Sequence, residues 1–133
     1  MTPLNDLARP PTPDTPALDT KRLESYRDLK DEEGELLRDI IGLFVSQTPE
    51  WIAAATAAAD EGDMSALQHI AHNLKGSCGA MGAVRMHACA SAIELAVGGG
   101  DASTIRPSVE ALTEEFKHVS ALLAEYASGL RAP

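Results

Sequence analysis

The feature that most constrains the fold of this 133-residue chain is the spacing of its apolar residues. Near the C-terminus these residues recur at alternating intervals of three and four, which places them all on one face of an α-helix. The residues that follow this spacing are Val109, Leu112, Phe116, Val119, Leu123, Tyr126 and Leu130. No segment shows the strict alternation of a half-buried strand. The sequence therefore predicts an all-α protein.

Glycine, proline and polar residues divide the helical pattern into five segments. The expected helices lie at about 20–29, 33–60, 63–80, 83–97 and 104–130. The first is short, and the other four are joined by brief connections. Helices of this length with short loops predict an up-and-down antiparallel four-helix bundle, preceded by a short additional N-terminal helix.

Thr48 and Pro49 leave two interpretations of the second helix open. Proline lacks a backbone N–H and clashes with the preceding turn, so it can kink a helix that continues through it. It is also favoured at the first position of a helix, in which case Thr48 would be the N-cap of a fresh start. The family resemblance described below favours the kinked, continuous helix.

The N-terminal segment differs in composition from the rest of the chain. Five of the eight prolines lie within the first sixteen residues. A segment of this kind buries too little apolar surface to offset the entropy of ordering it. We therefore expect residues 1–17 to form a flexible, proline-rich tail and residues 18–130 to form a single helical domain.

The charge balance narrows the classes of partner. With 20 acidic and 11 basic residues, the chain has a formal net charge of -9, which argues against nucleic-acid binding because no basic stripe is present. No apolar run is long enough to span a membrane, and the N-terminus lacks the pattern of a signal peptide. We expect a cytoplasmic protein without a membrane partner, in which Cys78 and Cys89 are small buried hydrophobes rather than a disulfide.

One histidine in the third segment stands out by its position. At ~100° per residue, the apolar residues between Leu67 and Met81 form one stripe, and His72 points about 150° away from the centre of that stripe. Helical side chains lean towards the N-terminus, so Gly76 is the residue that would otherwise cover the histidine. Gly79 lies within about 20° of His72 on the same helical wheel. Because each glycine inside a helix costs ~1 kcal/mol relative to alanine, we interpret Gly76 and Gly79 as giving a partner access to the imidazole.

This run resembles the signature of the histidine phosphotransfer (HPt) family, His-x-Leu-Lys-Gly-Ser/Ala with a further glycine six residues after the first. The matching residues are His72, Leu74, Lys75, Gly76, Ser77 and Gly82. The resemblance extends from about residue 18 to residue 130. It implies that His72 is a phosphoacceptor that exchanges a phosphoryl group reversibly with an aspartate of a receiver domain.

Three polar side chains are candidates to assist His72. Lys75 lies one turn away, where its ammonium would screen the charge of a phosphoryl group. Glu94 would lie beside His72 if the next helix folds back along this one, and its carboxylate would then orient the ring. The alternative for Glu94 is an ordinary solvated glutamate. Gln68, one turn earlier than His72, is a candidate hydrogen-bond donor to the phosphoryl group.

The remaining histidines fit the motif less well. His69 also faces outward, but the Lys-Gly pair has the correct spacing only when it is counted from His72. His87 and His118 lie on other helices without such a pair, and we expect both to be solvated surface residues.

The sequence contains no glycine-rich phosphate loop, no nucleotide-binding signature and no acidic cluster for Mg²⁺. We therefore expect a phosphotransfer intermediate rather than an ATP-dependent enzyme, with no cofactor of its own. The resemblance implies that its partners are the receiver domains of a hybrid histidine kinase and of a response regulator, with Mg²⁺ held by the receiver. We expect the protein to be a monomer.

Two other functions remain open at this point. An adaptor would dock receiver domains without transferring phosphate, although the complete His-Lys-Gly set favours chemistry. A metal-binding helical bundle would use His69, His72, His87 and Cys89. A zinc site needs three or four converging ligands, and a simple hairpin turns His87 away from the His72 surface.

Overall fold

The computed structural model describes residues 16–27, 34–99 and 102–130, and all regular structure within these ranges is helical. The helices are α2 (Thr20–Arg27), α3 (Glu35–Glu61), α4 (Met64–Met81), α5 (Val84–Val97), the short 3₁₀ helix η1 (Ala102–Thr104) and α6 (Ile105–Ser128). Their bounds agree with the segments predicted from apolar spacing to within a few residues. The predicted all-α class is confirmed.

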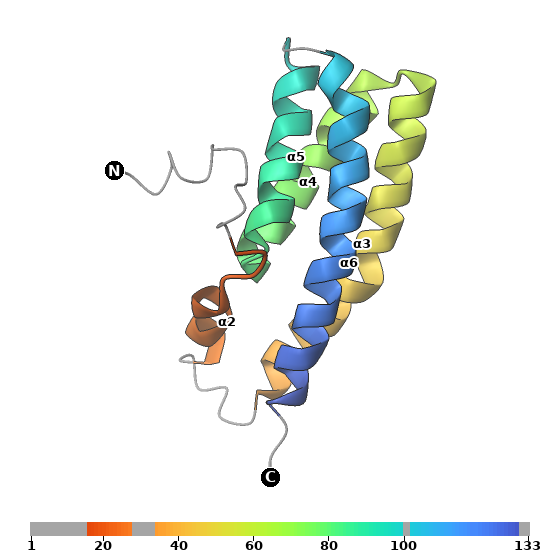
Figure 1. Cartoon of the computed structure of the whole chain (residues 1–133). Helices are drawn as coiled ribbons and strands as arrows, with labels where there is room; N and C mark the ends of the chain where they lie inside the picture. The colour runs from red at the N-terminus through yellow and green to blue at the C-terminus, as the bar shows by residue number, and fades with distance from the viewer. Residues whose placement is uncertain (1–15, 28–33, 100–101, 131–133) are drawn as a thin grey trace, which may run out of the picture.

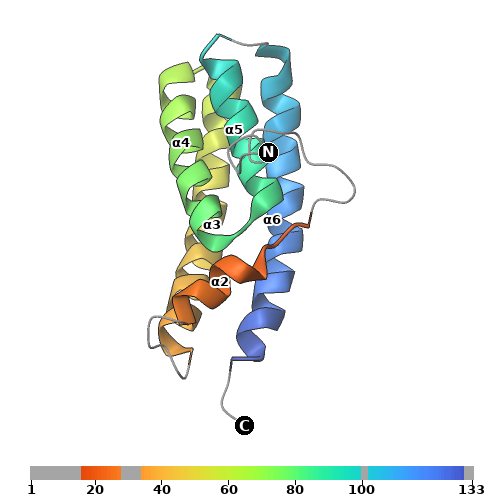
Figure 2. The same cartoon turned by 90° about the vertical axis from the view of Figure 1, so that its left-hand side faces the viewer.

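The four long helices lie side by side (Figure 1). Each packs against the next one along the chain, and α6 also packs against α3. The short helix α2 contacts α3 and α4, and it lies across the bundle close to the turn between α4 and α5 (Figure 2). A shared core thus fixes the positions of α4 and α5, the two helices that carry the predicted site residues.

Two glycines in the left-handed conformation end α3 and α4. Gly62 has φ 71° and Gly82 has φ 76°, a region that glycine enters without the steric cost that other residues incur. Asp63 then caps α4, accepting a hydrogen bond from the backbone N–H of Ala66 at 3.1 Å. A Cβ atom at Gly82 would come within 2.5 Å of the carbonyl oxygen of Asp19, so this turn also needs glycine to admit the start of α2. The turn at Gly82 makes α5 fold back directly along α4.

Helix α3 continues through Pro49, so the continuous-helix interpretation is confirmed and a fresh start capped by Thr48 is wrong. The Thr48 hydroxyl is buried and donates a hydrogen bond to the carbonyl oxygen of Phe44, 2.6 Å away within the same helix. Buried residues on both sides of the proline, such as Phe44 and Ile52, face the same core. A break in the helix would remove one of these groups from its packing, which outweighs the hydrogen bond that proline removes.

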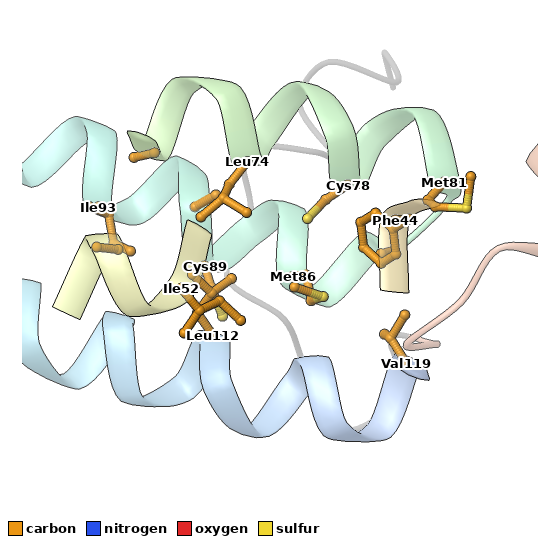
Figure 3. Close-up of a cluster of buried hydrophobic side chains, with 14 of the residues drawn as sticks. Phe44, Ile52, Leu74, Cys78, Met81, Met86, Cys89, Ile93, Leu112 and Val119 are labelled. Atoms are coloured by element: carbon orange, nitrogen blue, oxygen red, sulfur yellow. The ribbon is translucent and has the colours of Figure 1, made fainter. Parts of the chain in front are cut away.

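The core fills the space between the four long helices (Figure 3). Its labelled members come from every long helix: Phe44, Ile52, Leu74, Cys78, Met81, Met86, Cys89, Ile93, Leu112 and Val119. Both cysteines are free and buried, as predicted. Burial raises the pKa of the Cys78 thiol to about 12 and that of Cys89 to about 11, so both remain neutral and pack as small apolar groups.

The predicted tail, residues 1–17, lies outside the described residues except for its last two. Ala17 is buried against the core, so the packed part of the chain begins before residue 18. Leu29, expected on the first helix, also lies outside the described ranges. Within these ranges, every helix is too short or too polar to cross a membrane.

Candidate functional site

His72 projects from α4 into solvent, with 69% of its side chain exposed. Its neighbours Ala71 and Leu74 are buried in the core, and they fix the rotation of the helix that turns His72 outward. Among the described residues, the ring has a hydrogen-bond partner on one side. Its Nδ1 atom lies 2.8 Å from the Oε2 atom of Glu94 on α5. The structure therefore brings together the histidine and the carboxylate that the sequence placed on facing helices.

Glu94 contacts two site residues at once. Its second oxygen, Oε1, accepts a hydrogen bond from the Lys75 ammonium at 2.6 Å. The hydrogen bond from Lys75 is the main reason that the pKa of Glu94 lies below its ordinary value; partial burial opposes this shift, and the hydrogen bond with His72 adds to it. Glu94 is thus ionised at neutral pH, and an ionised carboxylate only accepts hydrogen bonds. The Nδ1 atom of His72 must therefore be the donor, which leaves the lone pair of a neutral ring on Nε2.

The two glycines predicted to give access differ in their surroundings. A Cβ atom at Gly76 would meet nothing within 4 Å, so the space beside His72 is open at this position. A Cβ atom at Gly79 would instead lie 3.4 Å from Cδ2 of His87. The ring of His87 on α5 thus lies at contact distance above Gly79, and the role of Gly79 in partner access stays a prediction.

His87 differs from the prediction of a solvated surface residue. It is half-buried, and its Nδ1 atom is buried with no hydrogen-bond partner among the described residues. Burial, followed by the nearby positive charge of Lys75, lowers the pKa of His87. The register of the hairpin explains this position, because the turn that places Glu94 opposite His72 also places His87 opposite Gly79. That signal was present in the sequence, but the expectation for His87 did not take it into account.

The other polar candidates lie at the edge of the site. Gln68 is exposed one turn before His72, and its side chain forms no hydrogen bond with any described residue. His69 is engaged with Asn73, whose side-chain amide donates to the His69 ring at 3.2 Å and to its carbonyl oxygen at 3.0 Å. Within residues 16–27, 34–99 and 102–130, no three His, Cys, Asp or Glu side chains are grouped as ligands for a metal ion.

Negative charge is scarce on the two helices that form the site. Helix α4 contains no Asp or Glu, although the chain has 20 such residues. Helix α5 contains one, Glu94, and its charge is neutralised by Lys75. The surface around His72 is therefore compatible with the approach of an anionic group.

Comparisons with known proteins agree with this geometry. The family model of the Hpt domain matches residues 39–128. The crystal structure of histidine-containing phosphotransfer protein B (HptB) from Pseudomonas aeruginosa PAO1 superposes with a TM-score of 0.78 and 27% sequence identity, covering 86% of this chain and 97% of that one. No curated protein sequence matches the chain significantly. The chain belongs to the Hpt domain family, the histidine phosphotransfer proteins of phosphorelays.

Proposed function

We propose that His72 is the phosphoacceptor and that it exchanges a phosphoryl group with the aspartate of a receiver domain. In this step the Nε2 lone pair attacks the phosphorus of the aspartyl phosphate. The N–P bond forms as the bond from phosphorus to the aspartate oxygen breaks, and the aspartate leaves as a carboxylate. Because Nε2 starts without a proton, no base is needed, and the reverse reaction follows the same path to a second receiver.

The neighbouring side chains have separate roles in this proposal. Glu94 holds the Nδ1–H of His72, which fixes the tautomer and stabilises the positive charge that the ring gains when Nε2 is phosphorylated. Lys75 lies one turn from His72 with an ammonium that can turn from Glu94 towards the phosphoryl oxygens. Gly76 leaves room for the receiver. Gln68 is a donor to the phosphoryl group from the other side.

The proposed partners are the receiver domains of a hybrid histidine kinase and of a response regulator. We propose that the receiver holds Mg²⁺, and that this chain uses neither ATP nor a cofactor of its own. We further infer a cytoplasmic monomer, consisting of an up-and-down antiparallel four-helix bundle with α2 as an additional short helix. The tight turns at Gly62 and Gly82 and the packing of α6 against α3 support this arrangement.

The observation that carries the proposal is the hydrogen bond between an exposed histidine ring and an ionised carboxylate, with open space at Gly76. The test is to incubate the protein with phosphorylated receivers of its source organism and to follow the label. We expect His72→Gln to fold normally and to accept no label. His69→Gln is the matched control, because His69 is exposed on the same helix one turn away, and it should accept label normally.

The same assay addresses the other candidate functions. Label that persists in His72→Gln, or that is lost in His69→Gln, would contradict the assignment. Wild-type protein that binds phosphorylated receivers but takes no label would identify an adaptor. Metal analysis of the purified protein tests the metal-binding bundle, and bound zinc that is lost in His72→Gln would favour that function.

A further inference from the structure

Helices α4 and α5 make a second close contact below the site, where the His87 ring lies on Gly79. The position of a Gly79 Cβ atom would be 3.4 Å from Cδ2 of His87 and 3.9 Å from its Nε2. A Cβ atom alone would therefore make an ordinary van der Waals contact with the ring, whereas a larger side chain at residue 79 would need the space that the ring takes. Its Nδ1 atom is buried without a partner in the part of the chain that the structure describes, an arrangement that is uncommon in folded proteins and calls for an explanation. Packing against Gly79 explains the burial, but not why a polar ring is used.

This contact is aligned with the site along the same two helices. Lys75 is four residues before Gly79, so both lie on one strip of α4. Glu94 is seven residues after His87, about two helical turns along one strip of α5. Besides the core residues that the two helices share, two cross-contacts thus lie along this edge of their interface, Gly79 with His87 and the Lys75–Glu94–His72 set. Because a close-packed interior transmits strain, we expect a change of helix spacing at the first contact to reach the second.

The charged groups around His87 favour the uncharged form of its ring. Lys75 is the charged group that faces it from α4, and its proximity lowers the pKa of His87. On α5 itself, Arg85 points towards α6, where it binds Glu115 at 2.9 Å, and Glu94 is already bound to Lys75. The residues of η1 carry no charge. Glu94 and Glu115 are thus paired with cations other than His87, whose buried Nδ1 atom has no hydrogen-bond partner among the described residues.

We propose that His87 is a positioning residue for the His72 site: its ring, seated on Gly79, sets the spacing of α4 and α5 at which one Glu94 carboxylate reaches both His72 and Lys75. This inference rests on the proposed function of His72. It also gives Gly79 a different role from Gly76. Gly76 keeps space for a partner, whereas Gly79 keeps space for a residue of this chain.

The proposal is tested with Gly79→Leu, His87→Ala and the double variant. A leucine at residue 79 should force the helices apart, and alanine at residue 87 should make room for it again. The first readout is the fraction of His72 protonated on Nδ1, measured by NMR of ¹⁵N-labelled imidazole rings, which requires no phosphate. The second is the rate of transfer from a phosphorylated receiver. Thermal unfolding establishes that each variant is folded.

We expect Gly79→Leu to lose the preference for Nδ1–H and to transfer about 10- to 100-fold more slowly, because a displacement of ~1 Å at a reacting group costs about 100-fold. The double variant should recover to within about threefold of wild type, the sign of direct coupling between two residues. Unchanged tautomer and rate in folded Gly79→Leu would overturn the proposal. So would a double variant as slow as Gly79→Leu, because a glycine needed for partner access is not rescued by a change at His87.

Two further arms keep the test decisive. If Gly79→Leu does not fold, the smaller Gly79→Val replaces it, since its methyl groups extend beyond a Cβ atom that would already contact His87 at 3.4 Å. A smaller change in the same direction, again reversed by His87→Ala, supports the proposal, and no change in the His72 tautomer contradicts it. If wild-type protein accepts no phosphate at all, the proposed function fails. The tautomer measurements then still decide whether His87 positions the ring.

Discussion

The carboxylate of Glu94 offers the sharpest test of how the site functions, because it can be changed in two graded steps. Glu94→Gln keeps an oxygen that can accept the His72 Nδ1–H but removes the negative charge. Glu94→Ala removes both. In wild type this side chain lies 2.8 Å from Nδ1 of His72 and 2.6 Å from Nζ of Lys75. The two variants therefore separate the orientation of the ring from the stabilisation of its charge.

The size of the effect follows from the exposure of the ring. A hydrogen bond to a charged group contributes ~1.5–3 kcal/mol when it is protected from water. His72 is 69% exposed, so solvent screens much of that interaction. We take about 1–2 kcal/mol as the share that acts on the transition state, which corresponds to a factor of about 5–30 in rate. We expect Glu94→Gln to fall within this range and Glu94→Ala to be slower still.

The assay is single-turnover transfer from a phosphorylated receiver at saturating concentration, so that binding does not limit the rate. Glu114→Gln is the matched control, because Glu114 also pairs with a lysine, 2.9 Å away on the exposed face of α6. It should transfer at the wild-type rate. Folded Glu94→Ala that also transfers at the wild-type rate would refute the reasoning, because an exposed ring would then need no partner on Nδ1.

The pH dependence of stability provides a second check on the same residue. The pKa of Glu94 in the folded protein lies below its ordinary value of 4.5, so the folded state favours the charged form. The stabilisation is therefore fully present above pH 4.5 and is lost as pH falls through the lowered pKa. The difference in unfolding free energy between wild type and Glu94→Gln should be small, constant near neutrality and vanishing in acid. A difference that grows as the pH falls would contradict the ion pair.

Three further predictions concern access, charge and docking. Gly76→Leu should place a side chain beside His72 and abolish transfer. The variant should unfold at the same or a higher temperature, because a glycine inside a helix costs ~1 kcal/mol relative to alanine. Normal transfer in the folded variant would show that the glycine is not needed for clearance. Because the pKa of His87 is lowered in the folded protein, the unfolded chain takes up a proton on this ring at higher pH than the folded chain does. Wild type should therefore lose stability as pH falls below 6.5. Chemical unfolding measured across pH should show a smaller loss for His87→Phe. Receiver binding measured by calorimetry should weaken little between low and high salt, because α4 carries no carboxylate and Leu43 on the adjacent α3 is 57% exposed; a steep loss would indicate charge pairing instead.

The fold could be predicted from the sequence because its signals are local and repeated. Apolar spacing gave the helices, and the glycines after α3 and α4 marked their ends. The state of the helix at Pro49 was harder to predict, because proline is compatible with both a kink and a fresh start. The structure resolves this ambiguity through packing on both sides of the proline, together with the hydroxyl of Thr48, which bonds to a carbonyl of its own helix. Packing of this kind is a tertiary effect that the local sequence does not contain.

The site shows the same division between what one helix specifies and what two helices specify together. The outward direction of His72 is a property of α4 alone, because its apolar stripe is well defined and the histidine lies almost opposite it. Gly79 lies within about 20° of His72 on the same wheel, which does not distinguish open surface from contact with a neighbouring helix. Helix α5 gives little help, since apolar residues surround nearly its whole circumference and its own pattern does not fix where His87 points. The register of the α4–α5 hairpin determines which residues of the two helices face each other, and one register accounts for both cross-contacts. The placement of Glu94 beside His72 and of His87 on Gly79 is therefore one inference rather than two, which is why we expect a change at either contact to be felt at the other.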